Sequence, residues 1–215
     1  MKFIDLTHKL YNGMPVFMDE ESPKLESVAE VNKNKYKATR LDIYSHNGTH
    51  IDAPAHIIEN GATLGEYDIE KFIGTAVIID CRDVALKEEP EINFNYIENN
   101  KEKADKADFI IFYTGYCEYW GSDKYKKNCP YLSIECAEYI ASKKKKGIGV
   151  DFMSPDKMGS GGLPTHKILL KNDVLIIENL ANLDKLDCDE FILTALPLKY
   201  DNADGAQVRV VAQIK

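Results

Sequence analysis

Short runs of apolar residues, each ended by a polar residue or a glycine, set the expected architecture of this 215-residue chain. Continuous apolar runs of this length are typical of strands that are buried on both faces. We therefore expect a sheet that other layers cover, with further strands at 40–44 and 206–212. The four runs that predict buried strands are 76–81, 108–114, 148–151 and 173–178.

Helices are expected to be fewer than strands. Ser133 is a suitable N-cap for a helix that continues through Ile140 and ends at Gly147. The lysines at 143–146 would then lie in its last turn, where positive charge complements the helix dipole. A second, polar helix is expected over 93–106. Strands with few helices predict a layered α/β or α+β domain.

Composition and charge exclude several classes of protein. With 44% hydrophobic and 29% charged residues, the chain has the balance of a globular protein rather than a disordered or membrane-embedded one. A net charge of −8 argues against nucleic-acid binding and gives no support for binding to anionic membranes. The number of cysteines, five, is odd. The acidic residue Asp5 lies where a signal peptide would need its apolar run. We expect free thiols, a cytoplasmic protein and one domain over 1–215.

Three of the five histidines lie within eleven residues, together with an aspartate. Pro54 excludes a regular helix there, so the histidine spacing is not that of a helical metal motif. An extended segment would place His50 and Asp52 on one face, with Ile51 toward the core. Imidazoles and a carboxylate suit zinc or a similar divalent ion, which we favour over ordinary hydrogen-bonded histidines. The four residues of this segment are His46, His50, Asp52 and His56.

A second group of candidate residues lies far downstream. His166 follows Pro164 and Thr165, and the apolar run after it ends at Glu178. A carboxylate at the end of a buried strand is costly unless it is paired or coordinated. An exposed strand end would explain Glu178 equally well, and His166 alone is a weak indication.

The histidine-rich segment resembles the pattern H-x-G-T-H-x-D-x-P-x-H of the putative cyclase family, whose best-known members are bacterial kynurenine formamidases. The seven specified positions are met by His46, Gly48, Thr49, His50, Asp52, Pro54 and His56. Weaker resemblances follow in the same order as in the family. They lie at 5–8, 14–16, 113–116, 149–156, 164–166, 178–180, 197–198 and 204–209.

The resemblance implies a fold, a metal centre and an assembly. The fold would be α/β, a three-layer β/β/α arrangement of the swivelling-domain type with mixed sheets and few helices. Two divalent ions are implied, zinc or alternatively manganese, in a homodimer or larger homo-oligomer. His46 and His50 would bind one ion, His166 the other, and Asp52 and Glu178 would bridge them. His56 would be the acid/base rather than a firm ligand.

The implied activity is hydrolysis of a small amide such as an N-formyl aryl amine, a reaction of tryptophan catabolism in the kynurenine formamidases. A metal-bound water that loses its proton near neutral pH would be the nucleophile, and His56 would protonate the leaving nitrogen. Alternatives are hydrolysis of an isatin-like cyclic amide and a metal-dependent cyclase or lyase that uses enolate chemistry. A non-catalytic binding protein is disfavoured, because binding alone does not need His56.

One departure from the family pattern concerns the substrate. The family usually has a tryptophan after the early Pro-Val, where it lines the aryl pocket, whereas this chain has Phe17. Met18, Asp19 and Glu20 then replace the usual Pro-Gly-Asp turn. We expect Phe17 to be a substrate-binding residue, with core packing as the alternative. The change puts formylkynurenine in doubt as the substrate without removing amide hydrolysis.

Overall fold

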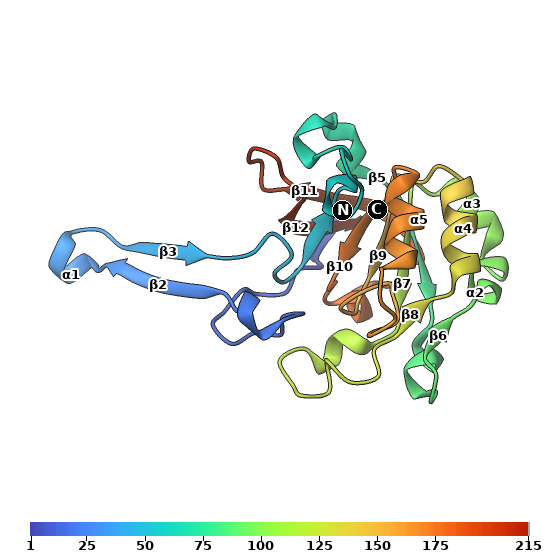
Figure 1. The fold of residues 1–215 in the computed structure, drawn as a ribbon, viewed down its shortest axis with the longest axis horizontal. Coiled ribbons are helices and arrows are strands. Elements are labelled where there is room, and N and C mark those ends of the chain that lie inside the picture. The colour runs from blue at the N-terminus through green and yellow to red at the C-terminus, as the bar shows by residue number, and fades with distance from the viewer. Residues whose placement is uncertain (215) are drawn as a thin grey trace.

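A closed sheet forms the centre of the computed structural model, which describes residues 1–214 (Figure 1). Its seven strands are β4 His50–Asp52, β5 Ile73–Asp80, β7 Phe109–Tyr113, β9 Gly147–Val150, β10 Leu175–Glu178, β11 Glu190–Pro197 and β12 Gly205–Ile214. The strand order is β12-β11-β5-β7-β9-β10-β4, and β4 pairs with β12 to close the sheet. Strands β5, β7, β9 and β10 pair in parallel. Each pairing in the ring that involves β4, β11 or β12 is antiparallel.

The long strand β12 has different partners along one edge. Its first residues, from Gly205 to Gln207, pair with β4, and its last residues pair with β1 (Lys2–Asp5). Strand β1 thus lies beside the closed sheet rather than within the ring. The pairing of β12 with β4 matters for the site, because it fixes the start of β12 beside His50 and Asp52.

Two hydrophobic cores lie on the two faces of the sheet. Strand β7 shows this by strict alternation along its length, as expected from the two-residue period of a strand. Phe109 and Ile111 belong to the core inside the closed sheet. Ile110 and Phe112 belong to the core between the sheet and the helices. Burial of these strands on both faces is therefore confirmed.

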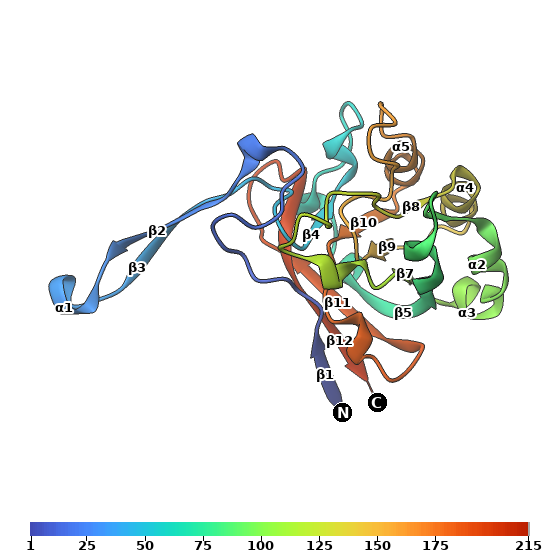
Figure 2. The same ribbon diagram turned by 90° about the horizontal axis from the view of Figure 1, so that it is seen from below.

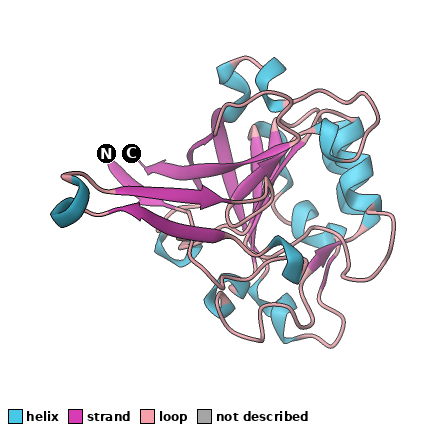
Figure 3. Cartoon of the chain, turned by 60° about the vertical axis from the view of Figure 1, so that its left-hand side comes forward, coloured by secondary structure: helices cyan, strands magenta, loops and turns pink. Residues whose placement is uncertain are grey.

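Four helices cover one outer side of the sheet, where Figure 2 shows them grouped beyond β5, β7, β9 and β10. Figure 3 distinguishes the helices of the chain from its strands by colour. The four helices are α2 Phe94–Glu98, α3 Lys101–Lys106, α4 Ile134–Ser142 and α5 Pro164–Lys171. Two short strands beside them, β6 and β8, form a parallel pair over Glu91–Ile92 and Tyr131–Leu132. Short 3₁₀ helices occupy Asp19–Glu21, Pro54–His56, Leu64–Glu66, Ile69–Phe72, Arg82–Leu86, Tyr116–Tyr119 and Leu183–Lys185.

A hairpin arm extends away from this body, as Figures 1 and 2 show. It consists of β2 (Lys24–Ala29), the single-turn helix α1 (Val31–Asn34) at its tip, and β3 (Ala38–Asp42). Because the arm has no body behind it, its apolar side chains remain exposed. Val28, Val31, Tyr36 and Leu41 are each more than half exposed.

The helices differ in part from those expected from the sequence. Ser133 caps α4 by accepting a hydrogen bond from the backbone N–H of Cys136, as expected. The helix ends at Ser142, however, so the lysines follow it rather than occupy its last turn. Lys145 is buried, and its Nζ donates to the backbone oxygens of Asp105 and Ala107. The segment 93–106 forms two short helices instead of one.

The expected mixture of strands with few helices is confirmed, but the three-layer β/β/α arrangement of the swivelling type is not. The strands close on themselves through the pairing of β4 with β12, a long-range contact that local patterns do not report. The five cysteines are free thiols within the described residues, as expected. No helix in residues 1–214 has both the length and the apolar character needed to cross a membrane.

Candidate metal centre

Neighbouring strands bring the two predicted groups of residues together. His50 and Asp52 lie on β4, which is antiparallel to β10 and places Glu178 directly opposite His50. His166 lies in the first turn of α5, the helix that precedes β10 in the chain. Glu178 is buried, so it is not an exposed strand end. Ile51, between His50 and Asp52, packs into the core inside the sheet, as the extended conformation predicts.

The two buried carboxylates, Asp52 and Glu178, each lie between histidines on two sides. One Asp52 oxygen, Oδ1, lies 2.7 Å from His46 Nδ1 and 3.3 Å from His50 Nε2, while Oδ2 lies 3.5 Å from His166 Nε2. Glu178 divides its oxygens in the same way. Its Oε2 lies 3.3 Å from His50 Nε2, and its Oε1 lies 3.3 Å from His166 Nε2. This arrangement suits two cations that share both carboxylates.

His46, His50, Asp52, His166 and Glu178 form one cluster. Several atoms of this cluster lack any hydrogen-bond partner among residues 1–214. They are His50 Nε2, Asp52 Oδ2 and Glu178 Oε1, and all three are buried. Buried polar atoms in proteins are almost always satisfied, so unsatisfied atoms that converge on one point need an explanation. Three sets of three possible ligand atoms each lie within 4.8 Å of one another: His46, His50 and Asp52; Asp52, His166 and Glu178; and His46, His56 and Asp204. The first two sets contain the residues with unsatisfied atoms. The donor set of imidazoles and carboxylates therefore fits divalent cations.

Each histidine of the cluster has its second ring nitrogen held by an acceptor outside it. His50 Nδ1 lies 2.8 Å from the backbone oxygen of Gly48, and His166 Nδ1 lies 2.6 Å from Asp156 Oδ2. His46 Nε2 lies 2.9 Å from Asp204 Oδ2. Such outer partners fix the tautomer and ring orientation of metal-binding histidines. The remaining nitrogen of each ring is thereby directed at the carboxylates.

The carboxylates control the charge of the imidazoles. Burial lowers the pKa of His46, but Asp52 and Asp204 outweigh this effect and raise the pKa to about 9. The pKa of His50 is likewise raised to about 10, because Asp52 and Glu178 outweigh its burial. Without a cation these rings hold protons at neutral pH. A cation that binds them must therefore displace protons, so its affinity should rise with pH.

His56 differs from the other three histidines. Its burial lowers its pKa below the ordinary value, so the ring is neutral at neutral pH and can accept a proton. Its ring centroid lies 3.9 Å from that of His46, and within residues 1–214 it forms no ion pair with Asp52 or Glu178. It follows β4 in the 3₁₀ helix Pro54–His56, which Pro54 starts. The ring is thus close to the cluster without belonging to it.

A cavity of about 250 Å³ opens onto the cluster. Its polar floor consists of the cluster residues and His56, and its walls are mainly apolar. The apolar walls include Val16, Phe17, Met18, Met153 and Leu163. Phe17 is 51% exposed, so it lies at the cavity and not in the core. The cavity has room for a small planar molecule beside the cluster.

Sequence reasoning missed the residues that support the histidines. Asp156 and Asp204 lie in segments noticed only for their resemblance to the family, and neither was assigned a role. The spacing of Asp156 from His166 is short, and Asp156 also accepts the backbone N–H groups of Thr165 and His166 at the start of α5. Because α5 begins only at Pro164 and is not among the helices predicted from the sequence, the local pattern around Asp156 did not report this contact. Asp204 gave no local signal.

Comparisons with known proteins show similarities over most of the chain. The family model described as "Putative cyclase" matches residues 4–157. A kynurenine formamidase of Bacillus mycoides (strain KBAB4) is 28% identical over 211 residues, which cover 98% of this chain and 96% of the relative. A solved structure titled as a potential metal-dependent hydrolase with cyclase activity has a TM-score of 0.81 and 29% identity, covering 98% of this chain and 96% of that one.

A third similarity concerns isatin hydrolase A from Labrenzia aggregata, solved with bound benzyl benzoate. Its TM-score is 0.85 at 25% identity, and the match covers 98% of this chain and 93% of that one. These similarities extend over nearly the whole chain, and the family match includes the histidine-rich segment. The chain therefore belongs to the putative cyclase family.

Proposed function

We propose that this protein is a metal-dependent hydrolase that cleaves a small amide, with N-formyl aryl amines as the first substrate class. The observation that carries the proposal is the buried cluster of three imidazoles and two carboxylates, open to an apolar cavity beside a neutral histidine. The relatives named kynurenine formamidase support the substrate class. If formylkynurenine is the natural substrate, the protein acts in tryptophan catabolism. The free thiols support a cytoplasmic location.

In this proposal the residues have distinct roles. His46 and His50 would hold one cation, His166 would hold the other, and Asp52 and Glu178 would contribute to both sites. Zinc suits this donor set, and manganese is the alternative. Bound cations would polarise the substrate carbonyl and lower the pKa of a water molecule. His56, whose Nδ1 faces Asp204 at 3.8 Å, would use Nε2 to transfer a proton to the leaving nitrogen.

A substrate panel tests the function. Protein purified without chelator would be assayed against N-formyl aryl amines, isatin-like cyclic amides and hydroxy acids, before and after removal of its metal. Hydrolysis of a formyl aryl amine that disappears with the metal and returns on reloading is the expected result. Turnover that survives complete metal removal, or turnover of hydroxy acids alone, would overturn the proposal.

Cyclic amides of the isatin type are the second candidate substrates. The similarity to isatin hydrolase A, at 25% identity over nearly the whole chain, favours them. Hydrolysis of a ring amide uses the same attack on a carbonyl, but the leaving nitrogen stays attached to the product. The apolar cavity beside the cluster suits a flat bicyclic molecule as well as an aryl formamide. Relative kcat/KM values within the same panel decide between them.

Phe17 is expected to form one wall of the substrate pocket. Phe17→Ala should raise KM for aryl substrates with a smaller effect on kcat, because stacking acts on the ground state and the transition state alike. Burial and stacking against the ring would contribute about 1 to 3 kcal/mol. Phe17→Trp should improve the hydrolysis of formylkynurenine if that compound is near the natural substrate. Unchanged KM together with loss of thermal stability in Phe17→Ala would contradict the pocket role.

We also propose a homodimer or larger homo-oligomer. The hairpin arm exposes apolar side chains that a second copy would cover, since contiguous exposed apolar surface is uncommon in monomers. Lys24 pairs with Asp42 at the base of the arm, so the segment between them can be replaced by a short glycine turn. We expect the complete protein to be at least dimeric by light scattering at micromolar concentration, and the shortened protein to be monomeric. A monomeric complete protein would contradict the assembly.

A further inference from the structure

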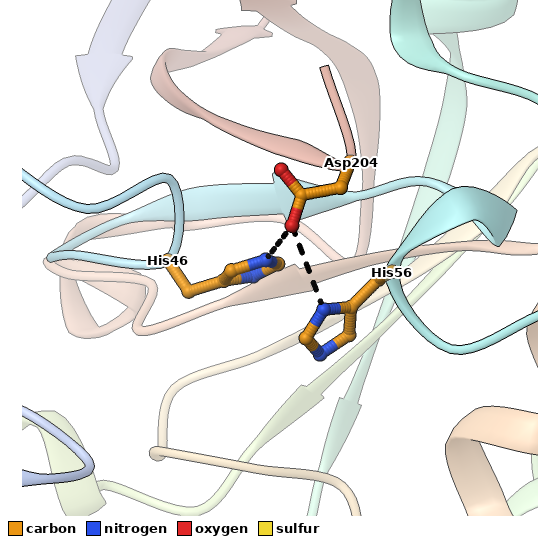
Figure 4. Close-up of side chains that lie close together, drawn as sticks. All are labelled: His46, His56 and Asp204. Carbon is orange, nitrogen blue, oxygen red and sulfur yellow. Dashed lines mark hydrogen bonds and ion pairs between the residues drawn. The ribbon is translucent and has the colours of Figure 1, made fainter. Parts of the chain in front are cut away.

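Two consecutive residues at the start of β12 enclose the ring of His46. Asp204 contacts the ring through its carboxylate, as Figure 4 shows, and Gly205 lies against the ring through its backbone. Both residues are about 160 positions away from His46 in the chain. We propose that they form a seat for His46, in which Asp204 is a positioning residue for the cation site. This inference rests on the proposed function only in so far as a cation binds His46.

The carboxylate of Asp204 holds one end of the imidazole while Asp52 holds the other. His46 Nε2 lies 2.9 Å from Asp204 Oδ2, and His46 Nδ1 lies 2.7 Å from Asp52 Oδ1. With Asp204 as acceptor, the proton of the neutral ring belongs on Nε2, so Nδ1 carries the lone pair that a cation needs. A carboxylate in this outer position also makes the ring a more basic ligand.

Asp204 is itself held by the closure of the sheet. Its backbone oxygen accepts a hydrogen bond from the N–H of Ala53 at 2.9 Å, and the next residue, Gly205, is paired with Asp52. The Ser45 hydroxyl also donates to its carboxylate at 3.4 Å. The pairing that places Asp52 inside the cluster therefore also places Asp204 outside it. The two carboxylates are fixed relative to each other with the ring between them.

Gly205 is needed for space and not for backbone conformation. A Cβ atom at this position would lie 2.5 Å from His46 Cε1 and 3.0 Å from each ring nitrogen. Real Cβ atoms essentially never approach that closely, so any side chain would displace the ring. A displaced ring cannot keep both of its carboxylate contacts. This glycine is thus an independent observation that the start of β12 is shaped around His46.

The same carboxylate also lies near the proposed proton-transfer residue. Asp204 Oδ2 is 3.8 Å from His56 Nδ1, and the rings of His46 and His56 are 3.9 Å apart between centroids. Figure 4 shows the carboxylate facing both rings. Loss of Asp204 would thus free two rings, one in the cation site and one beside it.

The test compares cation affinities before any assay of activity. Competition with a chromophoric chelator would give the zinc affinity of the wild type, Asp204→Ala and Asp204→Asn. Removing an outer partner of a metal-binding histidine typically costs on the order of 10- to 100-fold in affinity. We expect Asp204→Ala to lose affinity within that range. Asp204→Asn, which keeps an acceptor oxygen, should lose less and so act as a partial rescue.

Matched controls separate positioning from general damage. Asp201→Ala makes the same change three residues earlier in the same loop, at an exposed side chain, and should keep wild-type affinity. Gly205→Ala should weaken zinc binding by displacing the ring. Gly65→Ala should not, because a Cβ there meets no atom within 4 Å. Thermal unfolding of the metal-free proteins and the visible spectrum of cobalt-loaded samples would show whether the fold and the cation geometry persist.

The outcomes separate this inference from the proposed function. Wild-type zinc affinity and an unaltered cobalt spectrum in Asp204→Ala would overturn the seat for His46, whatever the enzyme hydrolyses. Absence of zinc binding in the wild type would overturn it as well. If the wild type binds zinc but hydrolyses no amide, the proposed function fails, and a loss of affinity in Asp204→Ala and Gly205→Ala still supports the seat.

Discussion

Replacing His56 by alanine is expected to leave the cations bound and to remove most of the turnover. General acid–base catalysis typically contributes on the order of a hundredfold or more to the rate. Three features of His56 suit a proton carrier: a lowered pKa, a place at the cavity and, within residues 1–214, no ion pair with Asp52 or Glu178. Elemental analysis and kcat measured on the same sample check both halves of the prediction.

His50→Ala is the contrasting variant for this test. His50 is fully enclosed between Asp52 and Glu178, so its loss should remove cations and turnover together. A His56→Ala protein that loses its cations as well would show that His56 is a ligand. A His56→Ala protein with nearly unchanged kcat would show that proton transfer uses another group.

The site residues that could be predicted best from the sequence are those that lie in one short segment. His46, His50, Asp52 and His56 lie close together in sequence, and one proline and one short strand fix how they are presented. Such a segment contains both the ligands and the backbone features that orient them. Local reasoning therefore reached most of the cluster, including the inward direction of Ile51.

The parts that local reasoning could not reach depend on strand pairing. Glu178 could have been an exposed strand end until the register opposite His50 placed it in the cluster. Asp204 acquires its contact with His46 only because β12 pairs with β4 and closes the sheet. The direction of β10 and β12 relative to β4 is set by contacts over more than a hundred residues. No residue pattern within either strand contains that information.

The hairpin arm shows a different limit. A strand over 40–44 was predicted, and β3 occupies Ala38–Asp42, but its alternating residues did not show that it would leave the body. Strands of a core and strands of an exposed arm use similar residues when a second surface covers the arm. The exposed apolar residues of the arm become informative only once the rest of the chain is seen to provide no cover for them.

Glu178→Ala is expected to reduce the cation content from about two equivalents per chain to one or fewer. Glu178 Oε2 lies 3.3 Å from His50 Nε2 and Oε1 lies 3.3 Å from His166 Nε2, so in the proposed dinuclear centre its loss would remove a ligand from both positions at once. The remaining cations would leave Asp52 as the only bridge. Turnover should fall with the cation content, because both positions lie at the floor of the same cavity.

Glu21 provides the matched control for this variant, since it lines the same cavity but belongs to none of the three groups of possible ligand atoms found within residues 1–214. Glu21→Ala should keep about two equivalents, so a loss confined to Glu178→Ala would reflect coordination rather than the charge of the cavity. Wild-type protein that saturates at a single equivalent would overturn the dinuclear centre. In that case one of the two sets of imidazoles facing Asp52 and Glu178 would hold a cation, and the other would hold a proton. Elemental analysis of fully loaded samples, read beside kcat, distinguishes these results.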